Sequence, residues 1–517
     1  MRKKRFFLVL FTALVIFGCS NSDVTNTADE NTNDDNTLTI AQGADLQSFD
    51  TGDNRHTPSD VILRNMFNRL FKRDNPESME IVPELVEDYE MVNENTWYFK
   101  LKEGVTFHNG DPLTAEDVEF TLNRVAKDDE VSENVYFGPV IDDVNVIDEL
   151  EFEIKTNGPS PTLLTLLSKS GSDILPKSYI EEVGWEEFGE NPVGSGPYKY
   201  VNWIKDDRVV LEENEEYFGG DITWNEVVIR SIPESSTRVS ELLAGGVDMI
   251  MNVPPSEWDR VNDDEDLTII KSPTSRVMTL IARTGENYIT SDPKVREAID
   301  LAINKEVLTN QILQGSGIPL RTRVVDASFG ANPELQNTLV YDPERAKQLL
   351  EESDYSDSEL ELTLQSPQGR YLMDSEVAEM IANMLSEVGI KVNLQMMESS
   401  SLSNAYSSAE NEELMLIGLG DPMMDASYSL NHFHSDDAIR LMDYSNSEVD
   451  ELFDSANSNM DSDEREKQYQ KIQEIIAEER PQILLYSEMA NYGTNLSISL
   501  TPYINDEIRF NDIEKVN

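Results

Sequence analysis

The sequence predicts an α/β protein with mixed sheets, folded as at least two lobes. Its 517 residues exceed what a single hydrophobic core usually supports. Amphipathic helices with clear start signals alternate irregularly with short strand patterns from about residue 38 to the end. No long linker interrupts this part of the sequence. We therefore expect a backbone that crosses between the lobes more than once.

The first ordered element expected is a short strand at residues 38–40. Further along, a capping box begins at Thr114, with Asp117 at the third helical position. It opens a helix whose apolar residues recur at spacings of four and three: Val118, Leu122 and Val125. Two more helices begin at an aspartate followed by a first-turn proline, at Asp292-Pro293 and Asp342-Pro343.

A fourth helix is expected to be capped by Asp374 or Ser375 and to end before Gly389, the usual place for a C-terminal glycine. A strand should leave this helix at once, because apolar residues alternate there with polar ones: Ile390, Val392, Leu394 and Met396. The succession of helix and strand is typical of α/β organisation.

Glycines indicate two turns with different roles. The Asn109-Gly110 step suits a tight hairpin that needs positive φ, and we interpret the neighbouring His108 as structural rather than catalytic. Gly194 and Gly196 permit a sharp turn and a close approach of two backbone segments. Because this Gly-Ser-Gly lacks both the Lys-Ser/Thr of a P-loop and a third glycine, it does not indicate phosphate binding.

The first residues have the pattern of a secretory signal peptide over residues 1–18. Basic residues at 2–5 precede twelve apolar or small residues at 6–17, followed by Gly18 and Cys19. A membrane-spanning helix needs about 20 apolar residues, so this stretch is too short to span. Cys19 is the single cysteine, and its context resembles a bacterial lipobox. The resemblance implies lipidation of Cys19, for instance with palmitate; the alternative is an ordinary signal peptide with an incidental cysteine.

Composition limits the partners of the mature chain. Residues 19–37 are nearly all small and polar, and we expect a flexible tether there. The full sequence has a formal net charge of −58, and removal of the basic signal peptide makes the chain more acidic still, which disfavours binding to nucleic acid or to anionic lipid through the protein surface. The acidic residues are dispersed and no Asp-x-Asp-x-Asp-Gly loop occurs, which argues against a calcium-binding array.

Several motifs, in a fixed order, resemble the bacterial extracellular solute-binding proteins of the peptide/nickel class, which are receptors of ABC importers. The most recognisable covers residues 97–118 (WYFKLKEGVTFHNGDPLTAEDV). The others are 192–198 (PVGSGPY), 243–248 (LAGGVD), 295–300 (VREAID), 366–370 (SPQGR), and Gly420-Asp421 with Asp425. Together these matches run from about residue 38 to residue 510.

The resemblance implies a two-lobed fold of the periplasmic-binding-protein type, class II, with an extra domain on lobe one. By analogy, lobe one comprises residues 38–60, 190–280 and 480–517. The extra domain comprises residues 61–189, and lobe two comprises residues 281–479. The lobes would close on a ligand by a hinge motion. The implied function is an extracytoplasmic, lipid-anchored receptor that delivers short peptides to an ABC permease and its ATPase; we expect a monomer without a cofactor.

Peptide receptors of this class bury a zwitterion, so the resemblance points to an acid and a cation in lobe two. The acid is Asp421 or Asp425, because the family's Asp-Pro-Asp is replaced here by Asp-Ala-Ser. The cation is Arg370, since a guanidinium can give a carboxylate two parallel hydrogen bonds. Aromatic pocket walls are expected at three further positions: Tyr371, Tyr428 and His432. Residues 249–253 are a candidate sheet edge for pairing with the peptide backbone.

Other functions fit the sequence less well. The fold could instead hold an oligosaccharide or a nickel or metal chelate, but only four histidines are present to bind metal. We expect no resident metal. An exported hydrolase is the third possibility, and neither Gly-x-Ser-x-Gly nor His-Glu-x-x-His occurs. We therefore expect no enzyme activity.

Overall fold

The computed structural model describes residues 36–53, 57–356 and 358–516. The predicted signal peptide, Cys19 and nearly all of the predicted tether lie outside the described residues. Within the described part, no helix combines the length and the low polarity needed to cross a membrane.

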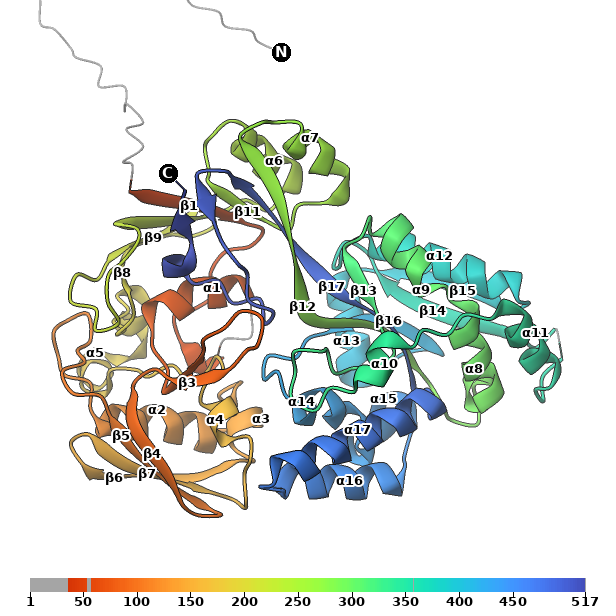
Figure 1. Cartoon of the computed structure of the whole chain (residues 1–517), viewed down its shortest axis with the longest axis horizontal. Coiled ribbons are helices and arrows are strands. Elements are labelled where there is room, and N and C mark those ends of the chain that lie inside the picture. Colours follow the sequence, from red (N-terminus) through yellow and green to blue (C-terminus); the bar gives the residue numbers. More distant parts are fainter. Residues whose placement is uncertain (1–35, 54–56, 357, 517) are drawn as a thin grey trace, which may run out of the picture. The chain divides into compact units, whose positions relative to one another are not determined.

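One large mixed sheet organises the fold (Figure 1). Strands β1, β10 and β11 pair in parallel, as do β14, β15 and β16, whereas the other pairings are antiparallel. Along the sheet the strands are β15 (Lys391–Met397), β14 (Glu361–Pro367), β16 (Leu414–Leu419), β12 (Leu267–Ala282), β17 (Gln482–Asn495), β11 (Met249–Met251), β1 (Thr37–Gln42), β10 (Glu226–Ser231), β9 (Arg208–Glu213) and β8 (Tyr198–Ile204), with β13 (Gly317–Pro319) on β17.

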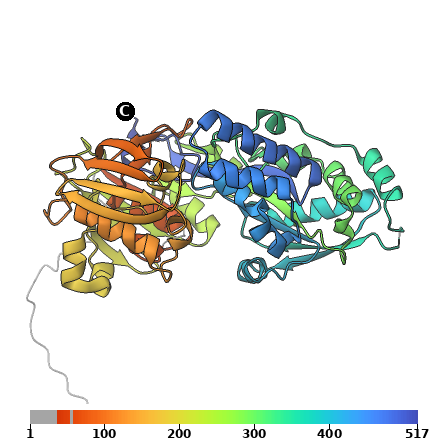
Figure 2. The same ribbon diagram turned by 90° about the horizontal axis from the view of Figure 1, so that it is seen from below.

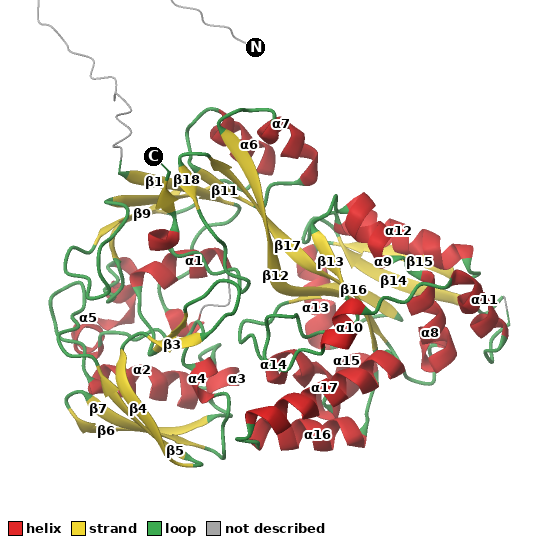
Figure 3. Ribbon diagram, in the orientation of Figure 1, coloured by secondary structure: helices red, strands yellow, loops and turns green. Residues whose placement is uncertain are grey.

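Strands β12 and β17 are the two long strands of this sheet, and each contributes to two hydrophobic cores (Figure 3). Ile270 of β12 and Tyr492 of β17 pack with the core around β1, β9 and β10. Leu280 of β12 and Leu485 of β17 pack with the core around α8 and α12. Their mutual register shifts between Pro273 and Val277, which places an irregularity between the two cores. The strands therefore link two lobes, as the sequence predicted; the lobe boundaries stay a prediction.

A separate four-stranded antiparallel sheet packs against α2 (Figure 2). Its strands are β4 (Val86–Asn93), β5 (Thr96–Leu101), β7 (Glu151–Thr156) and β6 (Ile141–Asp148). Two small hairpin-like pairs complete the strands: β2 (Phe71–Arg73) with β3 (Ile81–Pro83), and β18 (Ile498–Ser499) with β19 (Glu514–Lys515).

Helices occur throughout the described chain, some against the large sheet and some, such as α2, against the four-stranded sheet (Figure 3). In the first half of the chain they are α1 (Thr57–Met66), α2 (Ala115–Lys127), α3 (Asn134–Phe137), α4 (Leu163–Leu166), α5 (Lys177–Glu190), α6 (Ser235–Leu243) and α7 (Trp258–Asn262). In the second half they are α8 (Pro293–Ala302), α9 (Lys305–Val307), α10 (Pro333–Asn337), α11 (Pro343–Glu351), α12 (Asp374–Glu387), α13 (Ser399–Ser408), α14 (Ala426–Leu430), α15 (Ser435–Met442), α16 (Ser447–Ser458) and α17 (Ser462–Glu479).

Most of the predicted helix signals are confirmed. The Asp117 carboxylate accepts hydrogen bonds from the backbone N–H and the hydroxyl of Thr114, so the capping box forms at α2. Asp292 caps α8 by accepting from Lys294 N. Asp342 likewise caps α11, accepting from Arg345 N, and the residue after the C-cap of α12 is Gly389 with φ of 108°.

Two local predictions were wrong. Met373, with φ of 52°, precedes α12, and Asp374 is the first helical residue. Its carboxylate cannot serve as the predicted cap because it accepts hydrogen bonds from the backbone N–H groups of the preceding Gly369, Arg370 and Tyr371. Nor do residues 249–253 form a sheet edge, since β11 pairs with β1 on one side and β17 on the other.

The glycines at 194 and 196 let their backbone segment lie close against another one, as the sequence predicted. A Cβ at Gly194 would lie 2.0 Å from the carbonyl oxygen of Met66. His108 bonds to this turn: Gly194 N donates to its Nδ1 (3.2 Å), and its Nε2 lies 3.0 Å from the Gly196 oxygen. Burial lowers the pKa of His108 to about 4, so the imidazole stays neutral and fixes the turn.

Candidate ligand-binding site

Asp421 lies just beyond the end of β16 and is 1 % exposed. Its carboxylate accepts hydrogen bonds from Met423 N (3.1 Å) and from the hydroxyls of Ser328 (3.2 Å) and Ser429 (3.0 Å). Among the described lysines and arginines, none forms an ion pair with it. Burial raises the pKa of Asp421 to about 6, and the nearby charge of Asp425 adds to that effect. Asp421 is therefore a buried acid held by neutral groups.

Asp421 faces a cavity of about 240 Å³, which we call the inner cavity. Charged residues of both signs, from distant parts of the chain, line this cavity. Its charged lining comprises Asp60, Arg64, Arg69, Arg73, Glu133, Lys169, Arg276, Asp421, Asp506 and Glu507. Basic residues are concentrated here, although acidic residues outnumber them more than twofold in the whole sequence.

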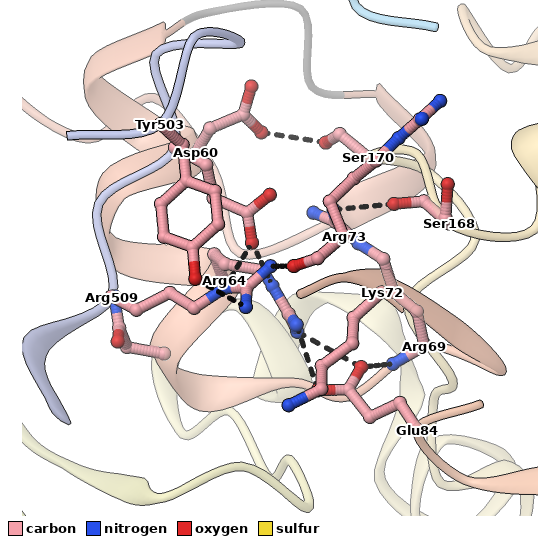
Figure 4. Close-up of polar contacts among 12 residues, drawn as sticks. Asp60, Arg64, Arg69, Lys72, Arg73, Glu84, Ser168, Ser170, Tyr503 and Arg509 are labelled. Atoms are coloured by element: carbon pink, nitrogen blue, oxygen red, sulfur yellow. Dashed lines mark hydrogen bonds and ion pairs between the residues drawn. The ribbon is translucent and has the colours of Figure 1, made fainter. Parts of the chain in front are cut away.

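Most of these basic side chains already have partners (Figure 4). Arg69 pairs with Asp173 at 2.7 Å, and Lys169 pairs with Glu133. Asp60 accepts a hydrogen bond from the Ser170 hydroxyl at 2.6 Å, and burial raises the pKa of this carboxyl to about 6. The cavity wall is thus a network of compensated charges around the carboxyl group of Asp421.

Arg73 ties the wall formed by β2 to the segment that carries Asp421. Its guanidinium donates to the carbonyl oxygen of Met79 at 2.6 Å and to that of Met423. Burial lowers the pKa of Arg73, and the carboxylates of Asp421 and Asp425 oppose that shift. The contact joins a strand near the start of the described chain to the loop between β16 and α14.

A second cavity of about 570 Å³, the outer cavity, shares Thr57, Arg276 and Asp506 with the inner cavity. Arg276 lies 3.4 Å from Glu488 and 3.8 Å from Asp506, measured between ion-pair atoms. Since the shared residues belong to both linings, the two cavities adjoin around Arg276.

The predicted cation, Arg370, lines the outer cavity together with Tyr371. Arg370 is exposed and donates to the Ser403 hydroxyl at 2.6 Å. The Tyr371 hydroxyl donates to the Gly418 oxygen at 3.1 Å. Because the loop at 369–371 is held by the Asp374 carboxylate, the position of Arg370 depends on that buried acid.

The second candidate acid, Asp425, has another set of partners. Its carboxylate accepts from Arg465 at 2.6 and 3.0 Å, and from Ser427 N at the start of α14. Both oxygens therefore take part in an ion pair, and one also takes part in a helix cap. The structure brings Asp421 to the inner cavity and places Asp425 against the helix α17 that carries Arg465.

Tyr428 and His432 line a third cavity of about 710 Å³, which we call the tyrosine cavity. Tyr428 also lines the inner cavity, as does Tyr136 of α3, and their hydroxyls lie 3.0 Å apart. This pair joins α3, which packs against the core of the four-stranded sheet, to α14. Burial, with Arg323 and Arg440 nearby, lowers the pKa of His432 to about 3, so this imidazole is neutral.

Sequence reasoning did not identify the wall of the inner cavity that faces Asp421 from the first 280 residues. The residues missed include Asp60, Arg73, Tyr136, Lys169 and Arg276. No short motif marks them, because they come from separate segments of the chain. Among the described residues, no group of three or more His, Cys, Asp or Glu is placed to hold a metal ion.

Comparison with known proteins identifies the family. Residues 80–440 match the model for bacterial extracellular solute-binding proteins, family 5 Middle. The chain belongs to this family. The resemblance stated from its motifs is confirmed, and so is the fold: two-lobed, α/β, with a mixed sheet. Members of the family are extracytoplasmic substrate-binding proteins of transport systems.

Two curated relatives and one solved structure illustrate the similarity. The oligopeptide-binding protein AppA of Bacillus subtilis is 27% identical over 418 residues, covering 75% of this chain and 74% of AppA. The glutathione-binding protein GsiB of Pectobacterium atrosepticum is 26% identical over 470 residues, covering 87% and 88%. The periplasmic binding protein DppA from Helicobacter pylori, in complex with the peptide STSA, is 24% identical with a TM-score of 0.77, covering 93% and 98%.

Proposed function

We propose that this protein captures short peptides between its two lobes and delivers them to an ABC permease, whose ATPase drives uptake. The observation that carries the proposal is Asp421, a buried acid without a cationic partner among the described residues, facing a cavity. A buried charge of this kind needs a counter-charge, and the ammonium group of a peptide would supply it. The names of the relatives AppA and DppA support a peptide as the cargo.

The peptide would run from Asp421 through the inner cavity, past Arg276, into the outer cavity. There Arg370 would receive the carboxyl end, with Tyr371 beside it. Asp425 is the weaker candidate for the amino end because Arg465 already occupies its oxygens. Tyr428 and His432 would contact side chains of the peptide from the tyrosine cavity. Closure excludes water and strengthens each ionic contact.

The remaining features of the proposal follow from the sequence. Lipid on Cys19 would anchor the receptor to the outer side of the cell membrane, with residues 19–37 as a tether. The receptor would act as a monomer, without a cofactor or a resident metal, and would release its cargo unchanged rather than act as an enzyme. Its acidity makes nucleic acid an unsuitable partner.

Isothermal titration calorimetry with peptides of defined length tests the proposal, using protein freed of ligand by unfolding and refolding. We expect 1:1 binding, and loss of several kcal/mol of binding free energy in Asp421→Ala, because a buried charge pair is broken. Asp436→Ala is the matched control, since the Asp436 side chain is 96% exposed. Unchanged affinity in Asp421→Ala would exclude that residue from the site. Tight binding of an oligosaccharide or a nickel chelate, with no peptide bound, would overturn the proposal.

A further inference from the structure

Asp506 is an acid that lines both the inner and the outer cavity. It lies in the segment between β18 and β19, and its side chain is 19% exposed. Among the described residues, none donates a hydrogen bond to this carboxylate, and its one ion pair is with Arg276, at 3.8 Å. That separation exceeds the length of a hydrogen bond, about 2.7–3.2 Å. The carboxylate of Asp506 is therefore open to a partner that enters the cavities.

Two other buried acids show how this protein usually compensates such a charge. Asp425 accepts two hydrogen bonds from Arg465, at 2.6 and 3.0 Å. Asp300 lies 3.0 Å from the ammonium group of Lys305. Neither of these acids lines the inner or the outer cavity. Asp506 differs from both because it combines a looser ion pair with direct access to cavity space.

Arg276 is shared between two acids, so it does not fully compensate Asp506. Its Nη1 donates to the Glu488 carboxylate at 3.4 Å, closer than its 3.8 Å contact with Asp506. Glu488 also lines the outer cavity. These three side chains bring two negative charges and one positive charge to the place where the cavities adjoin. Burial raises the pKa of Asp506; Arg276 opposes that shift, and Glu488 adds to it.

The backbone at Asp506 does not explain why an acid is present there. Its φ of 66° lies in the left-handed region, which glycine adopts without the steric cost that a side chain brings. Backbone hydrogen bonds hold the turn, since Asp506 N donates to the Tyr503 oxygen (3.1 Å) and Ser275 N to the Ile504 oxygen (2.8 Å). Glycine would suit this turn at least as well, so the contribution of Asp506 lies in its carboxylate.

We propose that Asp506 binds a second cationic group of the ligand, the side chain of a lysine or arginine at an interior position of the peptide. With the amino end at Asp421 in the inner cavity and the carboxyl end at Arg370 in the outer cavity, the middle of the peptide would pass the junction. A cation there would balance the excess negative charge beside Arg276 and Glu488. This inference rests on the proposed function and adds a specificity-determining residue to the same site.

The test compares alanine peptides of three to five residues in which one interior position holds lysine or glutamine. Calorimetry on the full mature protein should show the lysine peptide binding at least about tenfold more tightly than its glutamine counterpart at one of these positions. Asp506→Asn should reduce this ratio to within about twofold, because a neutral amide does not attract the ammonium group. Asp436→Asn removes an exposed acid and should keep the wild-type ratio.

Two further variants separate the roles of the two cavity acids. Asp506→Gly removes the carboxylate and suits the positive φ, so it should fold and should also lose the preference for lysine. Asp421→Asn should weaken both peptides alike and keep their ratio. Melting curves check that each variant folds; if neither Asp506 variant does, the wild-type ratio decides.

Three results would count against these assignments. Peptides that bind without a preference for lysine, or a preference that survives in Asp506→Asn and Asp506→Gly, would overturn this inference and leave the proposed function standing. Equal weakening of the lysine and glutamine peptides in Asp506→Asn would do the same, because the carboxylate would then act on a group that all peptides share. Failure of every peptide to bind would overturn both proposals.

Discussion

Replacing Asp421 by asparagine should stabilise the ligand-free protein at neutral pH. Asparagine has nearly the same shape and can accept from Met423 N while donating to the hydroxyls of Ser328 and Ser429, which can rotate. It mimics the protonated acid and removes a buried negative charge. A binding residue that costs stability in the empty protein is the expected signature of a site completed by its ligand.

The magnitude of this stabilisation follows from the pKa of Asp421, which burial raises from 3.8 to about 6. Between these values the folded protein holds a proton that the unfolded chain has released. Wild-type stability therefore falls as the pH rises from about 4 to about 6, by about 3 kcal/mol for a shift of about two pKa units. Asp421→Asn lacks this loss, so its advantage should grow over the same pH range and stay constant above about 7.

Urea unfolding at fixed ionic strength, followed by circular dichroism from pH 4 to pH 8, measures the difference. Comparison of the two proteins cancels the titration of other raised acids such as Asp60, and Asp436→Asn controls for a change in net charge. We expect the two stabilities to converge near pH 4. A variant that is less stable at pH 7, or a difference that does not change with pH, would refute the assignment of an uncompensated charge to Asp421.

Three other outcomes are expected. Gly194→Ala should destabilise the protein by several kcal/mol, because the Cβ of alanine would overlap the Met66 carbonyl. Thermal melting would detect this loss, and a melting temperature within a degree of wild type would contradict the packing. Asp425→Asn should lower the free energy of unfolding in urea by about 3 kcal/mol or more, since it leaves Arg465 buried without its carboxylate partner. An unchanged free energy of unfolding would contradict that pairing. Cys19→Ser should move the protein from the membrane fraction to the soluble fraction on immunoblots, and continued membrane association would argue against lipidation of Cys19.

Local signals predicted much of the fold. The capping box at Thr114 and the Asp-Pro starts of α8 and α11 depend on residues two or three apart, which a sequence displays directly. Asp374 shows the limit of this reasoning. Its position suggested a helix cap, but its carboxylate is engaged by the loop before it, and only the folded path of that loop reveals the competition.

Only one side of the candidate site could be predicted from the sequence. Motif resemblance led to Asp421, Arg370 and Tyr371, all within residues 281–479, the range predicted as lobe two. It could not separate Asp421 from Asp425, because the decisive partner, Arg465, is 40 residues further along the chain. On the opposite wall, Arg73 donates to the Met423 oxygen and the Tyr136 hydroxyl lies beside that of Tyr428, and no short pattern encodes contacts between residues 350 and 292 positions apart.

Native mass spectrometry of the mature protein, purified from its own host without refolding, tests the central claim most directly. The account predicts a population that carries one small molecule per protein, released on unfolding with the mass and fragmentation pattern of an intact short peptide. The same purification of Asp421→Ala should yield protein without that mass. A bound sugar or metal chelate in place of a peptide, or a bound peptide equally abundant in Asp421→Ala, would contradict the account.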